Sequence, residues 1–142
     1  MVRYLVFMIA LLAQTVAFAQ DPIEGVWYNE EKTAKIKIYK AKNDKFYGKI
    51  DWLKEPVNDG KTRTDEKNPD KDKRNEPLLG LVVLKGFEKS DKDQYEDGTI
   101  YDPKNGKTYS CIITHKGTQL DVRGYVGFSW IGRTAIWTRV PE

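Results

Sequence analysis

Short runs in which apolar and polar residues alternate strictly are the feature that most constrains the fold of this chain. In residues 34–39, Ala34, Ile36 and Ile38 share one face, and Lys35 and Lys37 share the other. This period of two is typical of a β-strand with one buried face. Similar runs lie at residues 46–52, 99–101, 107–113, 119–124 and 133–139, with turn-forming residues between them. Short strands joined by tight turns predict an all-β sandwich or barrel.

The segment 78–84 differs because it is apolar without interruption. It predicts a strand buried on both faces. A buried helix is the alternative, and Gly80 and Gly86 disfavour it. No segment has a convincing helical period, and we expect at most one short helical turn, near residues 87–93.

The two ends of the chain carry residues that favour a closed barrel over a sandwich. Gly25 and Trp27 stand on the first expected strand, and Trp137 and Arg139 stand on the last. A Trp ring can close one end of a small barrel, and an Arg guanidinium can stack on its face through a cation–π contact. The alternative is that these are ordinary residues of any all-β domain. We expect a single antiparallel up-and-down β-barrel of about eight strands.

The first 19 residues have the pattern of a signal peptide. Arg3 precedes an apolar run at residues 4–13, which is shorter than the roughly 20 residues that span a bilayer. Ala17 and Ala19 form the small-x-small pattern before a cleavage site, so Gln20 is the expected mature N-terminus. An uncleaved anchor is the alternative. We expect residues 20–142 to be one domain without a transmembrane segment, located in the periplasm or secreted.

The composition argues against several classes of function. The 24 Lys and Arg residues nearly balance the 21 Asp and Glu residues, which gives no electrostatic reason to expect nucleic-acid binding. Cys111 is the only cysteine, so an intrachain disulfide is excluded, and we expect it to be a small buried side chain on a strand. His115 is the only histidine and is expected in an exposed turn. These residues predict no metal site, no cofactor and no catalytic residue.

A long polar connection at residues 54–77 interrupts the regular strand spacing, and such loops are usually functional or flexible. From this loop we select Asp65 and Arg74 as candidate ligand-binding residues. The acidic residues Asp65, Asp102 and Asp121 would be available for hydrolysis, but their spacing does not bring two of them together.

The strand at residues 119–124 suggests a polar group inside the barrel. If Leu120 and Val122 packed outward, Arg123 and Tyr125 would point into a cavity and bind an acidic head group. The alternative is a structural ion pair of Arg123 with Asp121 or Asp65. The segment 124–132 is rich in aromatic residues and glycine, and we interpret it as a loop at the barrel mouth. Its Trp130, together with Tyr101 and Arg133, completes the candidate ligand-binding set.

Taken together, these motifs resemble the DUF2147 family of exported bacterial proteins. The shared elements include Gly25-Val26-Trp27, Tyr47-Gly48-Lys49-Ile50, Asp65-x-x-Asn68-Pro69, Arg74-x-x-Pro77-Leu78, residues 98–109, residues 120–127 and residues 132–139. The chain departs from the family at residues 95–98, where members often carry Trp and two glycines. The resemblance implies a lipocalin-like β-barrel, and it implies no particular function.

Our leading hypothesis is a non-enzymatic exported barrel that binds a small hydrophobic or amphipathic ligand. It rests on the fold and on a supply of aromatic side chains, namely Trp27, Phe46, Trp52, Tyr101, Tyr109 and Trp130. The same side chains could instead fill the barrel, which would make the protein an envelope module that interacts with another protein. An uncharacterised hydrolase is the third hypothesis.

Overall fold

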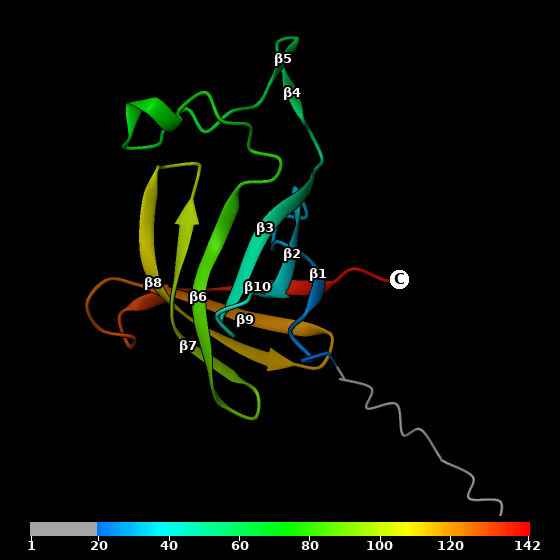
Figure 1. Cartoon of the computed structure of the whole chain (residues 1–142), viewed down its shortest axis with the longest axis vertical. Coiled ribbons are helices and arrows are strands. Elements are labelled where there is room, and N and C mark those ends of the chain that lie inside the picture. Colours follow the sequence, from blue (N-terminus) through cyan, green and yellow to red (C-terminus); the bar gives the residue numbers. More distant parts are fainter. Residues whose placement is uncertain (1–19) are drawn as a thin grey trace, which may run out of the picture.

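A computed structural model describes residues 20–142, and the predicted signal peptide lies outside the described residues. Eight strands form one closed barrel, as predicted (Figure 1). The barrel strands are β1 (Gly25–Tyr28), β2 (Ala34–Lys40), β3 (Phe46–Leu53), β6 (Val82–Asp91), β7 (Gln94–Asp102), β8 (Lys107–Lys116), β9 (Gln119–Tyr125) and β10 (Gly132–Arg139).

The barrel has up-and-down antiparallel topology, because every strand pairs with its neighbours along the chain. Only the β3–β6 connection is long, and β6 still pairs directly with β3. The first and last strands close the barrel by pairing Trp27 with Arg139 and Tyr28 with Thr138. This closure leaves no free edge among the eight strands.

Residues near the two ends of the chain seal one end of the barrel, as predicted for Trp27 and Arg139. Trp27 is fully buried, and its indole Nε1 donates a hydrogen bond to the carbonyl of Ile23 at 2.8 Å. The Arg139 guanidinium carbon lies 3.9 Å from the centre of the Trp27 ring, and its Nη1 donates to the carbonyl of Glu24 at 2.8 Å. We call Ile23, Gly25, Trp27 and Arg139 the latch.

Gly25 is required for the latch for two reasons. Its φ of +124° lies in a region that other residues rarely adopt, and a Cβ there would lie 2.4 Å from Nη1 of Arg139. The barrel half next to the latch is filled by large side chains, including Phe46, Phe87 and Tyr95. These rings are buried and Phe46 packs edge-on against Tyr95 at 5.3 Å, so the latch half has a solid core.

A β-bulge moves one predicted inward residue to the outside. On the β2–β3 ladder Lys35 pairs with Trp52, whereas Ile36 pairs with Ile50, so Asp51 is an extra residue on β3. The extra residue shifts the alternation by one position. Trp52 therefore points outward and is 37% exposed, and Leu53 lines the interior instead. The prediction that Trp52 faces inward with Phe46 and Ile50 was wrong for this reason.

Three other expectations need correction. The apolar segment 78–84 is a strand only from Val82 onward, and its first residues lead into the barrel as a loop. Residues 87–91 belong to strand β6 and form no helical turn. His115 lies on β8, not in an exposed turn; its side chain is 14% exposed and contacts Trp27 edge-on.

The 54–77 loop is folded in its own right and lies over the barrel end that contains the β7–β8 turn (Figure 1). It contains the small hairpin β4 (Val57–Asn58) and β5 (Lys61–Thr62) and the single 3-10 turn η1 (Lys71–Lys73). A bridge between Thr64 and Pro77 closes its base. The structure thus supports an ordered loop over the alternative of a solvated flexible one. Within residues 20–142, no helix is long and apolar enough to cross a membrane.

Candidate functional site

The half of the barrel away from the latch contains a partly open cavity of about 910 Å³. Its wall is made mainly of inward-facing aliphatic side chains from almost every strand, together with the aromatic ring of Trp137. The main wall residues are Ala34, Ile36, Ile50, Leu53, Val83, Ile100, Val122 and Ala135. Strand β9 contributes Gly124 where a side chain would stand, and a Cβ there would meet Ile100 and Tyr109 at 3.6 Å, which is ordinary contact distance. The cavity is apolar because period-two strands turn every second residue inward.

Four connections surround the mouth of this cavity. The β1–β2 turn, the 54–77 loop and the β7–β8 turn contribute polar residues, whereas the β9–β10 loop contributes the apolar Val126 and Ile131. Charged residues of both signs lie here, namely Glu30, Glu31, Arg63, Glu66, Lys67, Asp102, Lys104 and Arg133. Two of the four basic residues are paired across the mouth, Arg133 with Glu30 and Lys104 with Glu31, both at 3.6 Å. The site therefore combines an apolar interior with a polar rim of balanced charge.

Asp65 holds the long loop against the barrel wall. It has no solvent exposure, and its two carboxylate oxygens accept hydrogen bonds from the Tyr101 hydroxyl at 2.7 Å and from Asn68 Nδ2 at 2.8 Å. Burial, together with the bond to the Asp65 carboxylate, raises the pKa of Tyr101 well above its ordinary value. Tyr101 lines the cavity, whereas Asp65 lies behind it. A second contact holds the loop at Gly106, where a Cβ would clash with the carbonyl oxygen of Lys67.

Arg74 does not line the cavity. Its Nε donates to the carbonyl oxygen of Asn68 at 2.7 Å, which stabilises the loop that carries Asp65. Two of the residues chosen from the sequence, Asp65 and Arg74, thus belong to one network through Asn68. Neither is placed to contact a molecule inside the barrel directly.

Arg123 points away from the cavity, which corrects the expectation that it reaches into the barrel. Leu120 and Val122 are buried inside, so the alternating Arg123 lies on the outer face. Its Nε donates to the carbonyl of Ser129 at 2.6 Å and its Nη1 donates to Thr134 Oγ1 at 2.9 Å. The ion pair with Asp121 or Asp65, which was the alternative, is also absent from the ion pairs of residues 20–142.

The remaining candidates are divided between the mouth and the outside. Tyr101, Tyr125 and Arg133 line the mouth of the cavity. Trp130 lies outside it, is 73% exposed, and stacks on Phe128 with the ring centres 5.5 Å apart. The structure brings Tyr101, Tyr125 and Arg133 to one end of the barrel, and it separates them from Arg123 and Trp130.

The candidate site residues chosen from the sequence are mostly polar, and they include none of the aliphatic residues of the cavity wall. The signal that identifies the wall is the alternation itself, since Ile36 and Val122 stand on the apolar faces of their strands. The error arose at β9, where the apolar face was assigned to the outside. In a barrel with a single layer of strands, the apolar face has only the interior in which to be buried.

Neither the cysteine nor the histidine of the described residues lines the cavity. In residues 20–142 no three His, Cys, Asp or Glu side chains are placed to hold a metal ion. Cys111 is buried on β8 as predicted, and burial raises the pKa of its thiol to about 12, so the thiolate nucleophile is not formed near neutral pH. His115 lies 3.6 Å from Asp93 at the latch end, far along β8 from the residues that line the cavity.

The fold and the cavity define the class: a closed eight-stranded, lipocalin-like barrel with a solid half, a hollow half and a loop over the open end. The family described as uncharacterized protein conserved in bacteria (DUF2147) matches residues 25–139, and the chain belongs to this family. Among solved structures, it is similar to protein HP1028 from the human pathogen Helicobacter pylori, which belongs to the lipocalin family. That structure has a TM-score of 0.72 and 24% sequence identity, over 84% of this chain and 83% of that one. No curated protein matches the chain.

Proposed function

We propose that this protein binds a small hydrophobic or amphipathic molecule, with its apolar part in the cavity and its polar group at the rim. The observation that carries the proposal is the cavity of about 910 Å³ with an aliphatic wall. Pockets that hold small molecules are typically about 300–1,000 Å³, mostly apolar, with a few polar groups that fix orientation. Tyr101, Tyr125 and Arg133 supply such groups at the mouth.

The distribution of large side chains favours this function over a filled barrel. Of the buried aromatic side chains in residues 20–142, only Trp137 lines the cavity, whereas Trp27, Phe46 and Tyr95 lie in the latch half. On the mouth half, small or medium residues such as Ala34, Ala135 and Gly124 face inward. When side chains fill a barrel, its interior packs at high density and leaves no large space. The open space on the mouth half therefore suits a ligand with one long apolar chain or a few fused rings.

We further infer that the protein works outside the cytoplasm. The pattern of residues 1–19 supports this, and N-terminal sequencing of the protein from a periplasmic fraction tests it. An N-terminus at Gln20 is the expected result. Retention of Met1 on a membrane-bound chain would contradict the inference.

The binding proposal is tested with a pair of neighbouring substitutions on β10. Ala135 faces the cavity, and Ile136 is the next residue, 42% exposed on the outer face. Ala135→Trp fills the cavity, whereas Ile136→Trp adds the same side chain outside it. We would measure binding of the apolar fluorescent probe N-phenylnaphthylamine, and native mass spectrometry would reveal any co-purified molecule.

The expected result is saturable probe binding by the parent protein, weakened at least about tenfold by Ala135→Trp and unchanged by Ile136→Trp, where tenfold corresponds to about 1.4 kcal/mol. Thermal unfolding of both variants confirms that the barrel is intact. Equal binding by the two variants, or a parent protein that binds no probe and carries no extra mass, would refute the proposal.

A further inference from the structure

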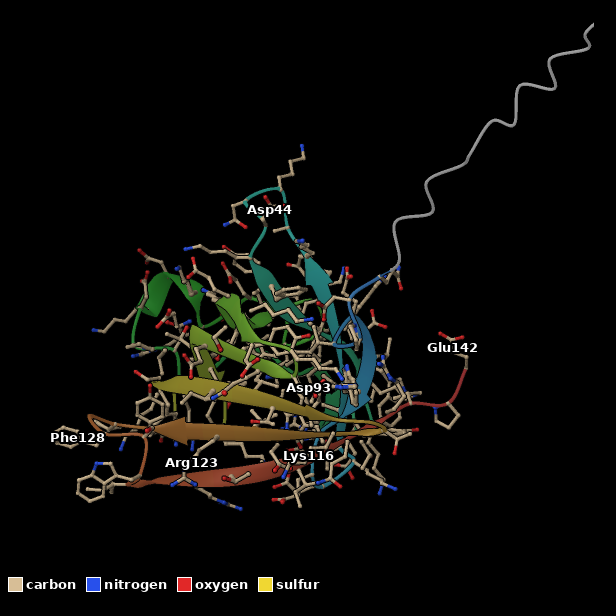
Figure 2. All side chains as sticks on the ribbon, turned by 90° about the horizontal axis from the view of Figure 1, so that it is seen from below. Asp44, Asp93, Lys116, Arg123, Phe128 and Glu142 are labelled. Atoms are coloured by element: carbon tan, nitrogen blue, oxygen red, sulfur yellow. The ribbon has the colours of Figure 1, made fainter. Side chains whose placement is uncertain are left out.

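The β9–β10 connection exposes an unusual cluster of large apolar side chains. We call residues 126–131 the aromatic loop. Val126 and Trp130 are each 73% exposed, Phe128 is 63% exposed and Ile131 is 56% exposed. They are the four most exposed large apolar residues of the described chain, and they lie within six positions. Figure 2 shows Phe128 and its neighbouring rings at the outermost tip of the β9–β10 end.

The aromatic loop is held in this exposed position by specific contacts. The Arg123 guanidinium bonds to the carbonyl of Ser129, and the backbone N–H of Ile131 donates to the carbonyl of Phe128 at 3.0 Å. The Phe128 and Trp130 rings stack on each other at 5.5 Å. The side chains are thus kept away from the barrel by the fold, although burying them against it would be favourable. Contiguous exposed apolar side chains in a soluble domain mark an interaction surface.

The charges around the aromatic loop indicate what kind of surface it meets. From Val122 to Pro141 the chain has no acidic residue, and the two arginines at the loop end of β9 and β10 are Arg123 and Arg133. Arg123 makes both of its bonds to neutral oxygen atoms, and Arg133 is paired with Glu30 at a distance of 3.6 Å with 83% of its side chain exposed. Exposed Trp and Phe beside arginine match the interface of an anionic bilayer, where aromatic rings lie at the level of the head groups.

The loop also adjoins the cavity. Val126 and Ile131, its first and last apolar residues, line the cavity mouth, whereas Trp130 lies on the outer side. An apolar path therefore runs from the tip of the loop into the barrel. We propose that the aromatic loop docks this protein on the surface of an anionic lipid bilayer, with Phe128 and Trp130 inserted between head groups and the cavity mouth facing the lipid.

The four tryptophans provide a direct readout. Trp27 is fully buried in the latch half, so docking leaves its environment unchanged. Trp137 is 5% exposed and lines the cavity, so it reports only a molecule that enters the cavity. Trp52 is 37% exposed on the outer face of β3, and Trp130 is the most exposed of the four. A blue shift on adding vesicles, or quenching by brominated lipid, would come from Trp130 and would be abolished in a Trp130→Phe variant but not in Trp52→Phe.

The test uses sedimentation with vesicles of phosphatidylethanolamine and phosphatidylglycerol. The expected result is binding by the parent protein that falls at least about tenfold when Phe128 and Trp130 are both replaced by Ser, because the two rings supply the apolar surface that docking buries. The matched control is Ile136→Ser, which removes an exposed apolar residue from the outer face of β10 and leaves binding unchanged.

Three results would overturn the proposal: no vesicle binding by the parent, equal binding by the double variant, or concentration-dependent self-association that the double variant abolishes. The last result would assign the loop to an interface between copies of the chain. Probe binding in the cavity is measured separately on the same variants. Loss of vesicle binding with retained probe binding, or the reverse, therefore distinguishes the failure of one proposal from the failure of the other.

Discussion

Replacing Gly25 by Ala should disrupt the latch through Arg139, and the size of the effect follows from the structure. The added Cβ would lie 2.4 Å from Nη1 of Arg139, so the guanidinium has to leave its position on Trp27. The φ of +124° adds backbone strain of about 1–3 kcal/mol for a residue with a side chain.

The contribution of Arg139 sets the other part of the magnitude. Its cation–π contact with the buried Trp27 is worth about 1–2 kcal/mol. Its hydrogen bonds to the carbonyls of Glu24 and Pro22 add about 1 kcal/mol each or more. We therefore expect Arg139→Ala to lower the free energy of unfolding by about 3 kcal/mol, a large part of the roughly 5–15 kcal/mol available to a domain.

The two effects are coupled, and urea denaturation at neutral pH measures the coupling. Gly25→Ala should cost about 4–6 kcal/mol in the parent protein but only the strain of about 1–3 kcal/mol when Arg139 is already Ala. Gly60→Ala is the matched control, since Gly60 has a φ of +74° with no atom within 4 Å of the added Cβ. Its cost should be the same in both backgrounds. If the effects of Gly25→Ala and Arg139→Ala were simply additive, the latch reasoning would be refuted.

Two further predictions concern carboxylates at opposite ends of the barrel, the buried Asp65 and the half-buried Asp21. Tyr101→Phe removes a donor from the buried Asp65, so it should lower stability by about 1–3 kcal/mol and speed hydrogen exchange across residues 63–77; slowed or unchanged exchange there would contradict the anchoring role. At the latch end, burial acts to raise the pKa of Asp21, but bonds from Lys89 and Tyr95 outweigh it and lower the pKa. Because the folded pKa lies below the unfolded value of about 3.9, the stabilisation is present at neutral pH and lost as pH falls through the folded pKa. Asp21→Asn should thus lower the urea midpoint by more at pH 7 than at pH 3, and an equal difference at both pH values would disprove the assignment.

The sequence predicts the barrel well because the relevant signals are local or lie at the chain ends. Alternation in residues 34–39 and 119–124 identifies strands without any knowledge of their partners. Trp27 and Arg139 pair although they are far apart in the sequence. This contact was predictable only because Trp27 stands on the first expected strand and Arg139 on the last.

The site was harder to predict because the inward direction of a strand depends on the whole barrel. The outward placement of Trp52 follows from one extra residue, Asp51, which no local pattern marks. Arg123 was assigned to the interior on the supposition that Leu120 and Val122 pack outward, whereas it supports the aromatic loop from outside. The wall of the cavity consists of ordinary aliphatic residues, and these carry no chemical signature in a sequence.

The position of the latch has a consequence for the order in which the barrel is made. A ribosome synthesises β1 first and β10 last of the eight strands. The contact between Trp27 and Arg139 therefore cannot form until the whole barrel has been synthesised. Until β10 emerges, β1 and β9 each have an unpaired edge and the interior is open to water. Closure is therefore a late event that depends on contacts of high sequence separation, which are slow to form. A chain of this design therefore cannot close its barrel before its last strand has been synthesised.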